Sequence, residues 1–303
     1  MKVYSIIVTY NGEKWIEKCL TSLNRSTIKT EILVIDNDSS DTTLSIIESK
    51  FPTISLAKLS TNIGFGQANN IGLKRAIENG ADNILLINQD AYVSDTTIER
   101  LVEIQNSYPE FGVLSPIHLN GSGTALDSGF ATYASPQFGC YEFLSDSYLN
   151  KLKNIYETQF VNAACWLISA GCVKKIGGFD PLFFHYGEDE NYVQRVLFHG
   201  YKIGICTETS ILHDRGEMTT IKKDFDLVIR ERFIELADVN KTETKRVLSK
   251  YIRSHFFRII KLFCLFKYSK LSENYKLMKF TIKFYRKIVE SVARNRTPGL
   301  TWL

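Results

Sequence analysis

Three consecutive carboxylates stand in the stretch FFHYGEDENY, residues 183–192, where Glu188, Asp189 and Glu190 follow four aromatic rings and a glycine. A solvated acidic run does not normally follow so much apolar surface. If a helix begins at Asp189, its carboxylate shares the face of the apolar residues at i+4, i+7 and i+8, and both glutamates point elsewhere. The alternative is a helix N-terminus capped by Asp189 with two solvated glutamates. The sequence thus singles out Asp189 as a carboxylate held for proton transfer.

Polar side chains also close three apolar runs of the chain. They are Thr9, Tyr10 and Asn11 after the first run, Asp36, Asn37 and Asp38 after the second, and Asn88, Gln89 and Asp90 after the third. In open α/β sheets, ligands bind outside the carboxyl ends of the strands. Asp38 and its neighbours also fit simple helix caps, whereas Asp36 and Asp90 directly end an apolar run. A cleft lined by such carboxylates suits a cation, or groups that a cation bridges.

A glycine-rich segment, NIGFGQANNIG at residues 62–72, precedes an expected helix. Such an entry to a helix indicates that backbone comes close to a ligand, for example a phosphate or a nucleoside. A dinucleotide-binding GxGxxG would follow the first strand, where this chain has only TYNGEK, and the lysine of a phosphate-binding P-loop is missing. The segment therefore predicts a nucleotide site of another kind.

These residues must be positioned by an α/β fold. Apolar runs at 3–10, 31–36 and 83–88 alternate with amphipathic segments near 13–24, 41–50 and 66–79, which is typical of βαβ units and a parallel sheet. Further strands are expected at 111–117 and 160–169, and a helix at 189–200. Residues 120–147 have no clear period, and we expect loops or short antiparallel pieces there.

The composition limits the class of protein. The chain has 303 residues and is 44% hydrophobic, enough for a sizeable core. Its six cysteines form no CxxC pair, which favours a reducing compartment. The N-terminus lacks a basic leader, and no 18-residue apolar stretch without charges occurs, so we expect a cytoplasmic protein, soluble or peripheral to a membrane.

Six motifs in register resemble one family. IIVTYN, LVIDNDSSD, NIGFGQANNIG, LLINQDA, GGFDPLFFHYGEDEN and HDRGE, in this order and at these distances, are similar to the family 2 glycosyltransferases of GT-A fold, and especially to the rhamnosyltransferase-like branch. The resemblance covers roughly residues 3–220. It implies a mixed, mainly parallel nucleotide-binding sheet flanked by helices, and transfer of a sugar from a nucleoside diphosphate by direct displacement with inversion.

The resemblance also implies roles for individual residues. The donor, a dTDP- or UDP-linked sugar, is expected to contact Thr9, Tyr10, Asn11, Asp36, Asn62, Gly64, Asn69 and Asn88. Asp90 matches the final acid of the metal-binding DxD motif, which reads NQD here, and His213 matches a position that can complete a Mg²⁺ or Mn²⁺ site. Arg215 is near enough in sequence to assist with charge. A divalent ion is required by the chemistry as well, because a diphosphate leaves poorly unless its charge is neutralised.

The resemblance places the general base in the acidic motif, at Asp189. For the acceptor or sugar pocket we expect Asp127, Trp166, His185 and Glu188. Each has a structural alternative: a turn for Asp127, a solvated position for Glu188, and a place in the core for His185 and Trp166, which is the favoured one for Trp166. For His213 a purely structural role is the alternative.

The last part of the chain carries no family signature but a strong charge. Residues 241–303 hold 16 Lys and Arg against three Glu, a net charge of +13, whereas residues 1–240 carry −9. Residues 250–292 place apolar side chains at helical intervals with basic residues on other faces; these are Ile252, Phe256, Ile260, Phe263, Leu277, Phe280, Phe284 and Ile288. We expect a glycosyltransferase domain at 1–220 and basic helices at 221–303 that lie on a membrane surface. The alternative is that these apolar faces pack on protein, either the catalytic domain or a second subunit of a homo-oligomer.

The sequence thus predicts an enzyme that adds one sugar, for example rhamnose, to a lipid-linked glycan of the bacterial surface, at the inner face of the cytoplasmic membrane. Nucleic acid is a weaker partner, because no recognised binding fold accompanies the basic charge. Two alternatives are a sugar-phosphate nucleotidyltransferase and a catalytically silent carbohydrate-binding protein. The first lacks its basic glycine-rich loop after the first strand, and both Asp90 and Asp189 argue against the second.

Overall fold

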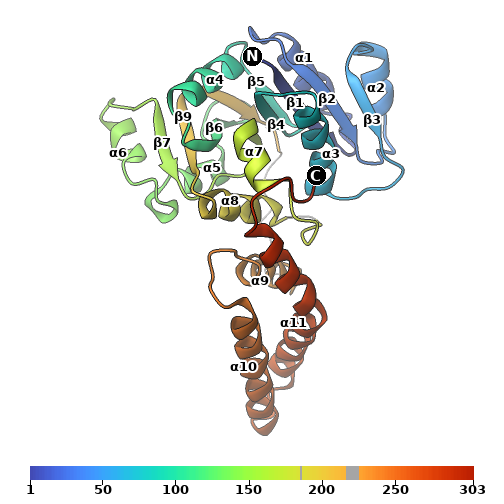
Figure 1. The fold of residues 1–303 in the computed structure, drawn as a ribbon, viewed down its shortest axis with the longest axis vertical. Coiled ribbons are helices and arrows are strands. Elements are labelled where there is room, and N and C mark those ends of the chain that lie inside the picture. Colours follow the sequence, from blue (N-terminus) through green and yellow to red (C-terminus); the bar gives the residue numbers. More distant parts are fainter. Residues whose placement is uncertain (185, 216–224) are drawn as a thin grey trace. The chain divides into compact units, whose positions relative to one another are not determined.

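The computed structural model describes residues 1–184, 186–215 and 225–303, and the chain divides into two compact units (Figure 1). The first unit comprises Met1–Thr220 together with Pro298–Leu303, and the second comprises Ile221–Thr297. The second unit is therefore an insertion, in sequence, before the last six residues.

The first unit is built on one mixed sheet. Within the described residues its nine strands follow the order β3-β2-β1-β4-β8-β6-β9-β5, and β7 pairs with β9. The strands are β1 Val3–Thr9, β2 Glu31–Asp36, β3 Ser55–Lys58, β4 Asn83–Ile87, β5 Ala91–Val93, β6 Phe111–Asn120, β7 Ile155–Thr158, β8 Cys165–Ser169 and β9 Lys202–His213. β1 pairs in parallel with both β2 and β4, so the carboxyl ends of these three strands meet at one edge of the sheet.

Helices cover both faces of this sheet (Figure 1). They are α1 Ile16–Asn24, α2 Thr43–Lys50, α3 Phe65–Glu78, α4 Thr97–Ser107, α5 Ser128–Tyr133, the 3₁₀ turn η1 Pro136–Phe138, α6 Phe143–Tyr148, α7 Ala170–Ile176 and α8 Glu188–Phe198. All seven residues of β1 are buried. Successive side chains of a strand point to opposite faces, and accordingly Ile6 packs with Leu73 of α3, whereas Ile7 packs with Leu20 of α1. This burial on both sides explains why the strand reads as a continuous apolar run.

The expected strands and helices of the first unit are present, with shifted ends. The strand expected at 160–169 is shorter, at Cys165–Ser169. The expectation for residues 120–147 was wrong, because this segment forms the short helices α5, η1 and α6 with only one isolated bridge, Leu119 to Leu126. Helices of three to six residues are too short to show a helical period in the sequence.

The last residues of the chain pack on the first unit. The Gly178 amide donates to the Thr301 carbonyl at 2.8 Å, and the Gly299 amide donates to the Lys175 carbonyl at the same distance. Leu303 packs against the core cluster that contains Ile6. A Cβ on Gly177, whose φ is +81°, would lie 2.0 Å from the Thr301 carbonyl oxygen, so this close approach requires glycine.

The second unit is helical, with α9 Phe225–Leu236, α10 Thr244–Cys264 and α11 Tyr268–Asn295. α10 and α11 form an antiparallel hairpin with a buried seam at heptad-like spacing; its members are Leu248, His255 and Leu262 of α10 and Asn274, Leu277, Thr281 and Ile288 of α11. Phe280 and Phe284 pack on Phe233 of α9, with ring centroids 4.5 and 5.0 Å apart.

The expectation that the apolar face of α11 lies on a membrane was therefore wrong, because these residues pack inside the unit. No helix among the described residues is long and apolar enough to cross a bilayer.

Candidate active site

Strand pairing brings Asp90 and His213 together. Ala91, the first residue of β5, lies opposite His213 at the end of β9, and the Asp214 amide donates to the Asp90 carbonyl at 2.8 Å. The His213 Nε2 atom lies 3.7 Å from Asp90 Oδ1. The His213 side chain is almost fully buried, whereas Asp90 keeps 18% of its side chain exposed. Asp90 is therefore the member of this pair that a ligand can reach.

Asp127 stands on the other side of the His213 ring. Its Oδ2 lies 3.4 Å from His213 Nδ1, and its Oδ1 lies 2.7 Å from Arg215 Nη2. Asp127 is also the N-cap of α5, where Oδ1 accepts the backbone amides of Gly129 and Phe130 at 2.8 and 3.0 Å. Both oxygens of this buried carboxylate therefore have neighbours within the protein.

The pKa values of the two carboxyls move in opposite directions. Burial raises the pKa of Asp90 above its ordinary value, and the nearby His213 offsets only part of this. Burial also acts to raise the pKa of Asp127, but the neighbouring His213, the Phe130 amide and the charge of Arg215 outweigh it and leave the pKa lowered. The lowered pKa favours an ionised Asp127 beside His213.

The orientation of His213 fits a cation site. The two ring nitrogens of His213 face different carboxylates, Nδ1 facing Asp127 Oδ2 and Nε2 facing Asp90 Oδ1. A cation between Nε2 and Asp90 Oδ1, which lie 3.7 Å apart, would be held by both atoms. No group of three or more candidate ligands occurs in the part of the chain that the structure describes. A site made of Asp90 and His213 alone suits a Mg²⁺ or Mn²⁺ ion that takes its remaining ligands from phosphate oxygens and water.

A second histidine, which the sequence did not single out, supports this pair. His118 is completely buried, its Nε2 lies 2.9 Å from Ser115 Oγ, and its ring centroid lies 6.1 Å from that of His213. Burial, together with the neighbouring His213, lowers the pKa of His118 to about 3, so it stays neutral. A neutral ring here adds no charge that would repel a cation.

The ends of β1, β2 and β4 form the second part of the site. Thr9 pairs with Asp36 across the sheet, and Thr9 Oγ1 donates to Gln89 Oε1 at 2.6 Å. Gln89 also accepts the Tyr10 amide and donates to the Tyr10 carbonyl. Asp36 is 1% exposed, and its Oδ2 accepts the Ser39 amide, while its buried Oδ1 has no hydrogen-bond partner. A buried acceptor without a donor is suited to a polar ligand.

Tyr10, in contrast, is about half exposed. Asn11 has a positive φ of 48° and fixes the loop after β2, where its Oδ1 accepts the Ser40 amide at 2.9 Å. The Asn88 backbone amide donates to the Ala164 carbonyl. The buried Oδ1 of Asn88 lacks a hydrogen-bond partner, as does Asp36 Oδ1. The structure thus brings Thr9, Asp36 and Asn88 to one edge with two unused acceptor atoms.

The segment after β3 is fixed by an asparagine pair. Asn37 Nδ2 donates to Asn62 Oδ1 at 2.9 Å, and Asn37 Oδ1 accepts the Ile63 amide. Asn62 Oδ1 also accepts the Gly64 amide, and a Cβ on Gly64, whose φ is +87°, would lie 2.1 Å from the Phe184 carbonyl oxygen. Gly64 is therefore required where this segment meets the acidic motif.

The acidic motif begins α8 one residue earlier than expected. Gly187, in a left-handed conformation, precedes the helix, and Glu188 is its first residue. The alternative of a solvated Glu188 was wrong, since this side chain is only 6% exposed and its Cβ faces Gly66 of α3. Asp189 and Glu190 are half-buried, and Asp189 Oδ1 accepts the Glu190 amide at 2.9 Å. Asp189 is thus more accessible than the sequence indicated.

Tyr133 connects this motif with the Asp127 cluster. Burial raises the pKa of Tyr133 to about 12, and the charges of Asp189, Glu190 and Asp127 add to the effect while Arg215 opposes it. Both clusters therefore lie within electrostatic range of one phenol. Next to the acids, Asn191 is completely buried and neither atom of its amide has a partner among the described residues. Neither Tyr133 nor Asn191 was singled out from the sequence, although Asn191 adjoins the acidic run.

Three residues expected at the site are buried in the protein. Trp166 is 0% exposed and stacks on Phe179 with ring centroids 6.4 Å apart, so it lies in the core, which was the favoured interpretation of the sequence. Asn69 is buried inside α3, and its Nδ2 donates to the Phe65 carbonyl. Asp127 is occupied as described above. His185 lies outside the described residues.

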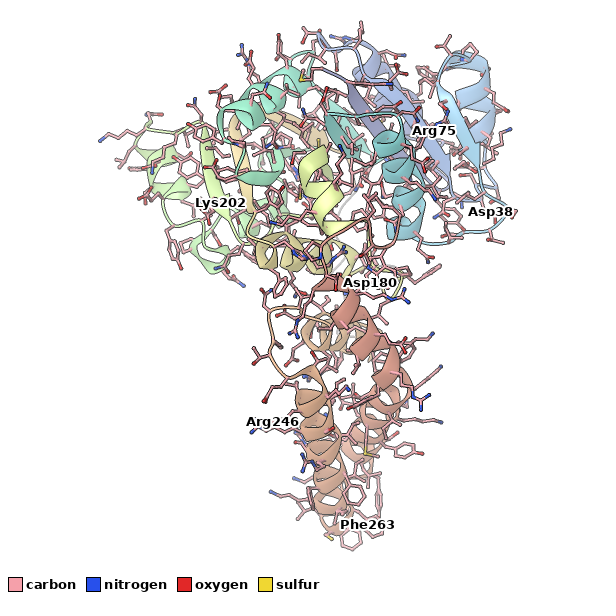
Figure 2. The ribbon with its side chains drawn as sticks, viewed as in Figure 1. Asp38, Arg75, Asp180, Lys202, Arg246 and Phe263 are labelled. Carbon is pink, nitrogen blue, oxygen red and sulfur yellow. The ribbon has the colours of Figure 1, made fainter. Side chains whose placement is uncertain are left out.

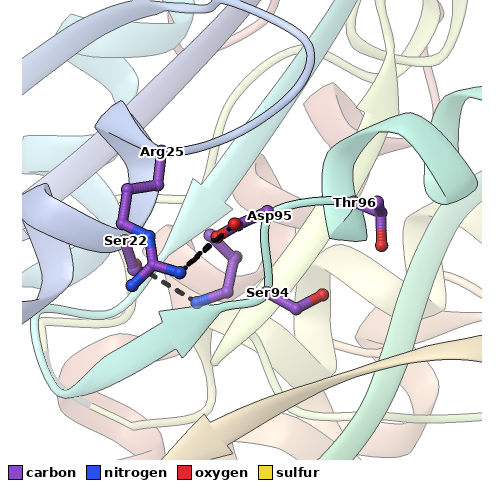
Figure 3. A pocket seen from close by; sticks show the side chains of 6 residues that line it. Ser22, Arg25, Ser94, Asp95 and Thr96 are labelled. Atoms are coloured by element: carbon purple, nitrogen blue, oxygen red, sulfur yellow. Dashed lines mark hydrogen bonds and ion pairs between the residues drawn. The ribbon is translucent and has the colours of Figure 1, made fainter.

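The depression drawn in Figure 3 is a different place. It is lined by Ser22, Arg25, Val93, Ser94, Asp95 and Thr96. Its Arg25–Asp95 ion pair, 3.1 Å long, is largely exposed, and exposed pairs of this kind contribute little. None of the predicted site residues lines it.

Comparison with known proteins identifies the family. The family model described as "Glycosyl transferase family 2" matches residues 5–177. The N-acetylglucosaminyl-diphospho-decaprenol L-rhamnosyltransferase of Mycobacterium tuberculosis is 22% identical over 234 residues, which cover 71% of this chain and 76% of that protein. The poly(ribitol-phosphate) β-N-acetylglucosaminyltransferase TarS of Staphylococcus aureus is 24% identical over 272 residues, 84% of this chain but only 44% of TarS.

Solved structures share the fold. The crystal structure of TarS residues 1–349 with UDP-GlcNAc superposes with a TM-score of 0.56 at 18% identity, over 80% of this chain and 68% of that one. A mannosyltransferase from Pyrobaculum calidifontis in complex with GDP-Man and Mn²⁺ gives 0.53 at 18% identity, over 78% and 62% of the two chains. The sheet is thus of the GT-A type, and the family model excludes the nucleotidyltransferase and silent-protein alternatives. With more than half of its length matched by that model, the chain belongs to glycosyl transferase family 2 and is a glycosyltransferase.

Proposed function

We propose that this glycosyltransferase moves one sugar from a nucleoside diphosphate to a hydroxyl of a lipid-linked surface glycan, with inversion at the anomeric carbon. The observation that carries the proposal is the facing pair Asp90 and His213, with His213 oriented by Asp127. A divalent ion bound by this pair would neutralise the charge of the leaving diphosphate. Asp36 and Asn88 would receive polar groups of the nucleoside and ribose, because both carry unused buried acceptors.

Asp189 is proposed as the general base. A base needs to reach the attacking hydroxyl before its pKa matters, and Asp189 is only half-buried, whereas Glu188 is buried. At the start of the helix, Asp189 engages the Glu190 amide through Oδ1, which leaves Oδ2 to receive the proton. The buried amide of Asn191 would help to hold a substrate hydroxyl or water nearby.

The proposed sugar is rhamnose, and the proposed acceptor class is a glycan carried on a polyprenyl diphosphate. Support comes from the mycobacterial relative, whose name gives an L-rhamnosyl transfer to a decaprenol-linked acceptor. The TarS resemblance supports UDP-GlcNAc as the second donor to test. An acceptor in a bilayer agrees with a protein that works at the inner membrane surface and whose residues 241–303 carry a net charge of +13.

The test combines binding with one substitution. Thermal unfolding of the full chain would be measured with dTDP-rhamnose and UDP-GlcNAc, each with and without Mn²⁺, because a ligand that binds only the folded state raises stability. We expect a stabilisation that requires Mn²⁺ in the native protein and is lost in Asp90→Ala. Asp95→Ala, which changes an exposed aspartate in the depression of Figure 3, is the matched control. Undiminished Mn²⁺-dependent donor binding by Asp90→Ala would refute the proposal.

A further inference from the structure

The end of the α10–α11 hairpin carries a cluster of exposed apolar side chains. Eight lie between residues 256 and 275, and each is at least 47% exposed: Phe256, Phe257, Ile260, Phe263, Leu265, Phe266, Tyr268 and Tyr275. We call this set the hairpin tip. Figure 2 labels Phe263 at this end of α10 and Arg246 at the opposite end. A contiguous apolar patch of this kind marks an interaction surface.

Folding of the hairpin does not explain the tip. The buried seam of α10 runs through Leu248, His255 and Leu262, whereas Phe256, Ile260 and Phe263 lie on another face. A buried polar pair already fixes the register of the two helices, because His255 Nδ1 lies 2.9 Å from Asn274 Oδ1 inside the hairpin. Phe256, Ile260 and Phe263 therefore lie outside the buried seam that pairs the two helices.

The backbone conformation of Phe266 is a second sign that the tip does not serve the pairing of the helices. It lies in the connection between the helices with a φ of +54°, a conformation that glycine or asparagine adopts more readily than a bulky residue. Its side chain is 76% exposed, and among the described residues its ring contacts only that of Tyr268, another tip residue, with centroids 6.3 Å apart. Most of the aromatic surface of Phe266 is therefore left for a partner outside the fold.

The charged residues around the hairpin tip indicate which kind of partner covers it. Residues 253–279 hold seven Lys and Arg against one Glu, and Lys261 and Lys267 alternate with the tip residues. The cores of protein interfaces are depleted of lysine, whereas interleaved aromatic and basic side chains are typical of segments at the surface of anionic bilayers. Lysine stems can also lie along apolar chains while their ammonium groups reach the phosphates.

We propose that the hairpin tip inserts end-on among the headgroups of an anionic lipid bilayer. A helix lying flat presents an apolar stripe along its whole length. Here Ile282 is the one large apolar residue more than half exposed in the described hairpin beyond the tip. The inference rests on the membrane association in the proposed function and names the residues and the orientation through which it occurs.

A native cysteine allows a direct test. Of the six cysteines, all in the described part of the chain, only Cys264 is exposed, and it lies within the tip. An environment-sensitive fluorophore attached to Cys264 should shift its emission to the blue with phosphatidylglycerol-containing vesicles and little with pure phosphatidylcholine. Lipids brominated near the headgroup should quench it more than lipids brominated at the chain end. Emission unchanged by anionic vesicles would overturn the proposal.

Substitutions at exposed positions give the second test. In the full chain, Phe257→Ser, Phe263→Ser and Phe266→Ser combined should weaken partition into anionic vesicles by at least about 100-fold, because three aromatic side chains that only partly leave water among the headgroups each contribute less than a fully buried one. The matched control is Tyr141→Ser, Tyr148→Ser and Leu149→Ser, three exposed apolar residues of the first unit that should leave partition unchanged. Equal loss in both triple variants would contradict a specific tip.

Phe266→Gly separates folding from binding. It relieves the positive φ, so the melting temperature should stay equal or rise while vesicle partition falls severalfold. If instead the tip variants convert a lipid-free dimer into a monomer in analytical ultracentrifugation, the tip is a contact between copies and the proposal is wrong. Stabilisation by UDP with Mn²⁺ should be retained in all tip variants; its absence in the native protein would count against the proposed function and not against the tip.

Discussion

Asp189 and Glu190 stand side by side at the start of α8, both half-buried, which makes them a matched pair. If Asp189 is the general base, Asp189→Asn should lower kcat by about 10²- to 10⁴-fold, because a positioned base contributes about that much. Stabilisation by donor and Mn²⁺ should persist in this variant. Glu190→Gln should lose far less, and steady-state transfer kinetics would compare the two. Near-normal transfer by folded Asp189→Asn would rule out the role.

Asp127 acts through His213 and is a positioning residue. Asp127→Asn keeps an oxygen for the Gly129 and Phe130 amides but loses the charge that faces His213 and Arg215. Loss of such a partner typically weakens a metal site by about 10- to 100-fold. Titration of Mn²⁺ with UDP, followed by electron paramagnetic resonance, should show this weakening.

The control for Asp127 is its role as a helix cap. Asp127→Ala also removes the N-cap of α5, so its free energy of unfolding should fall by about 1 kcal/mol. That of Asp127→Asn should stay unchanged. Unchanged Mn²⁺ affinity in Asp127→Asn would mean that the carboxylate only caps α5.

Local sequence predicted some of these residues and missed others. Asp36 and Asp90 could be found because each ends an apolar strand. Glu188 could not be placed, because helical geometry fixes the direction of a side chain only for residues inside the helix, and the sequence did not show that α8 begins at Glu188. The partnership of Asp127 with His213 was also hidden, since the long β6–β9 pairing brings the two together.

At the scale of elements, the polar pair inside the α10–α11 hairpin should make its stability depend on pH. Burial lowers the pKa of His255 below its ordinary value of 6.5, an effect that Arg232 and Arg258 strengthen and the hydrogen bond to Asn274 opposes. The unfolded chain then takes up a proton first as the pH falls. The free energy of unfolding is therefore fully present above about pH 6.5 and decreases below it.

The measurement is urea denaturation followed by helical circular dichroism at several pH values between about 5 and 8, the range in which histidine titrates. His255→Gln can still donate to Asn274 but does not titrate, so its free energy of unfolding should fall less steeply below about pH 6.5. Identical pH dependence in both proteins would contradict a role for His255.

The elements themselves were predictable where their signal was local. β1, β2 and β4 are buried on both faces and read as apolar runs. β5 and β7 have three and four residues and exist because β9 pairs with each of them. No window of the sequence contains that information, since the stabilising partner lies far away in the chain. The faces of α10 and α11 show the same limit, because an amphipathic pattern does not reveal whether protein or lipid covers it.

At the scale of the whole molecule, the final segment has its own test. Removal of Pro298–Leu303 deletes two backbone hydrogen bonds and the partly buried Leu303 from the first unit. We expect a loss of about 2–4 kcal/mol in the free energy of unfolding of that unit. Thermal unfolding with UDP and Mn²⁺ would report it.

The matched variant replaces residues 221–297 by a flexible Gly/Ser linker and retains 298–303. It should keep the UDP-dependent stabilisation and lose vesicle association. If the two shortened proteins were equally stable, the last six residues would have no structural role. A simple truncation after residue 240 does not separate these effects, because it removes the hairpin and the final segment together.

The return of residues 298–303 to α7 also orders events during synthesis. These residues emerge from the ribosome after the whole of α9, α10 and α11, so the first unit can complete its contacts only when the helical unit has been made. The hairpin, in contrast, needs only contacts between neighbouring helices and can fold as soon as it emerges. The contacts of residues 298–303 with α7 are therefore the last contacts of the first unit to form. Under the proposed insertion of the hairpin tip, the helical unit is ready for a bilayer before the catalytic unit is complete.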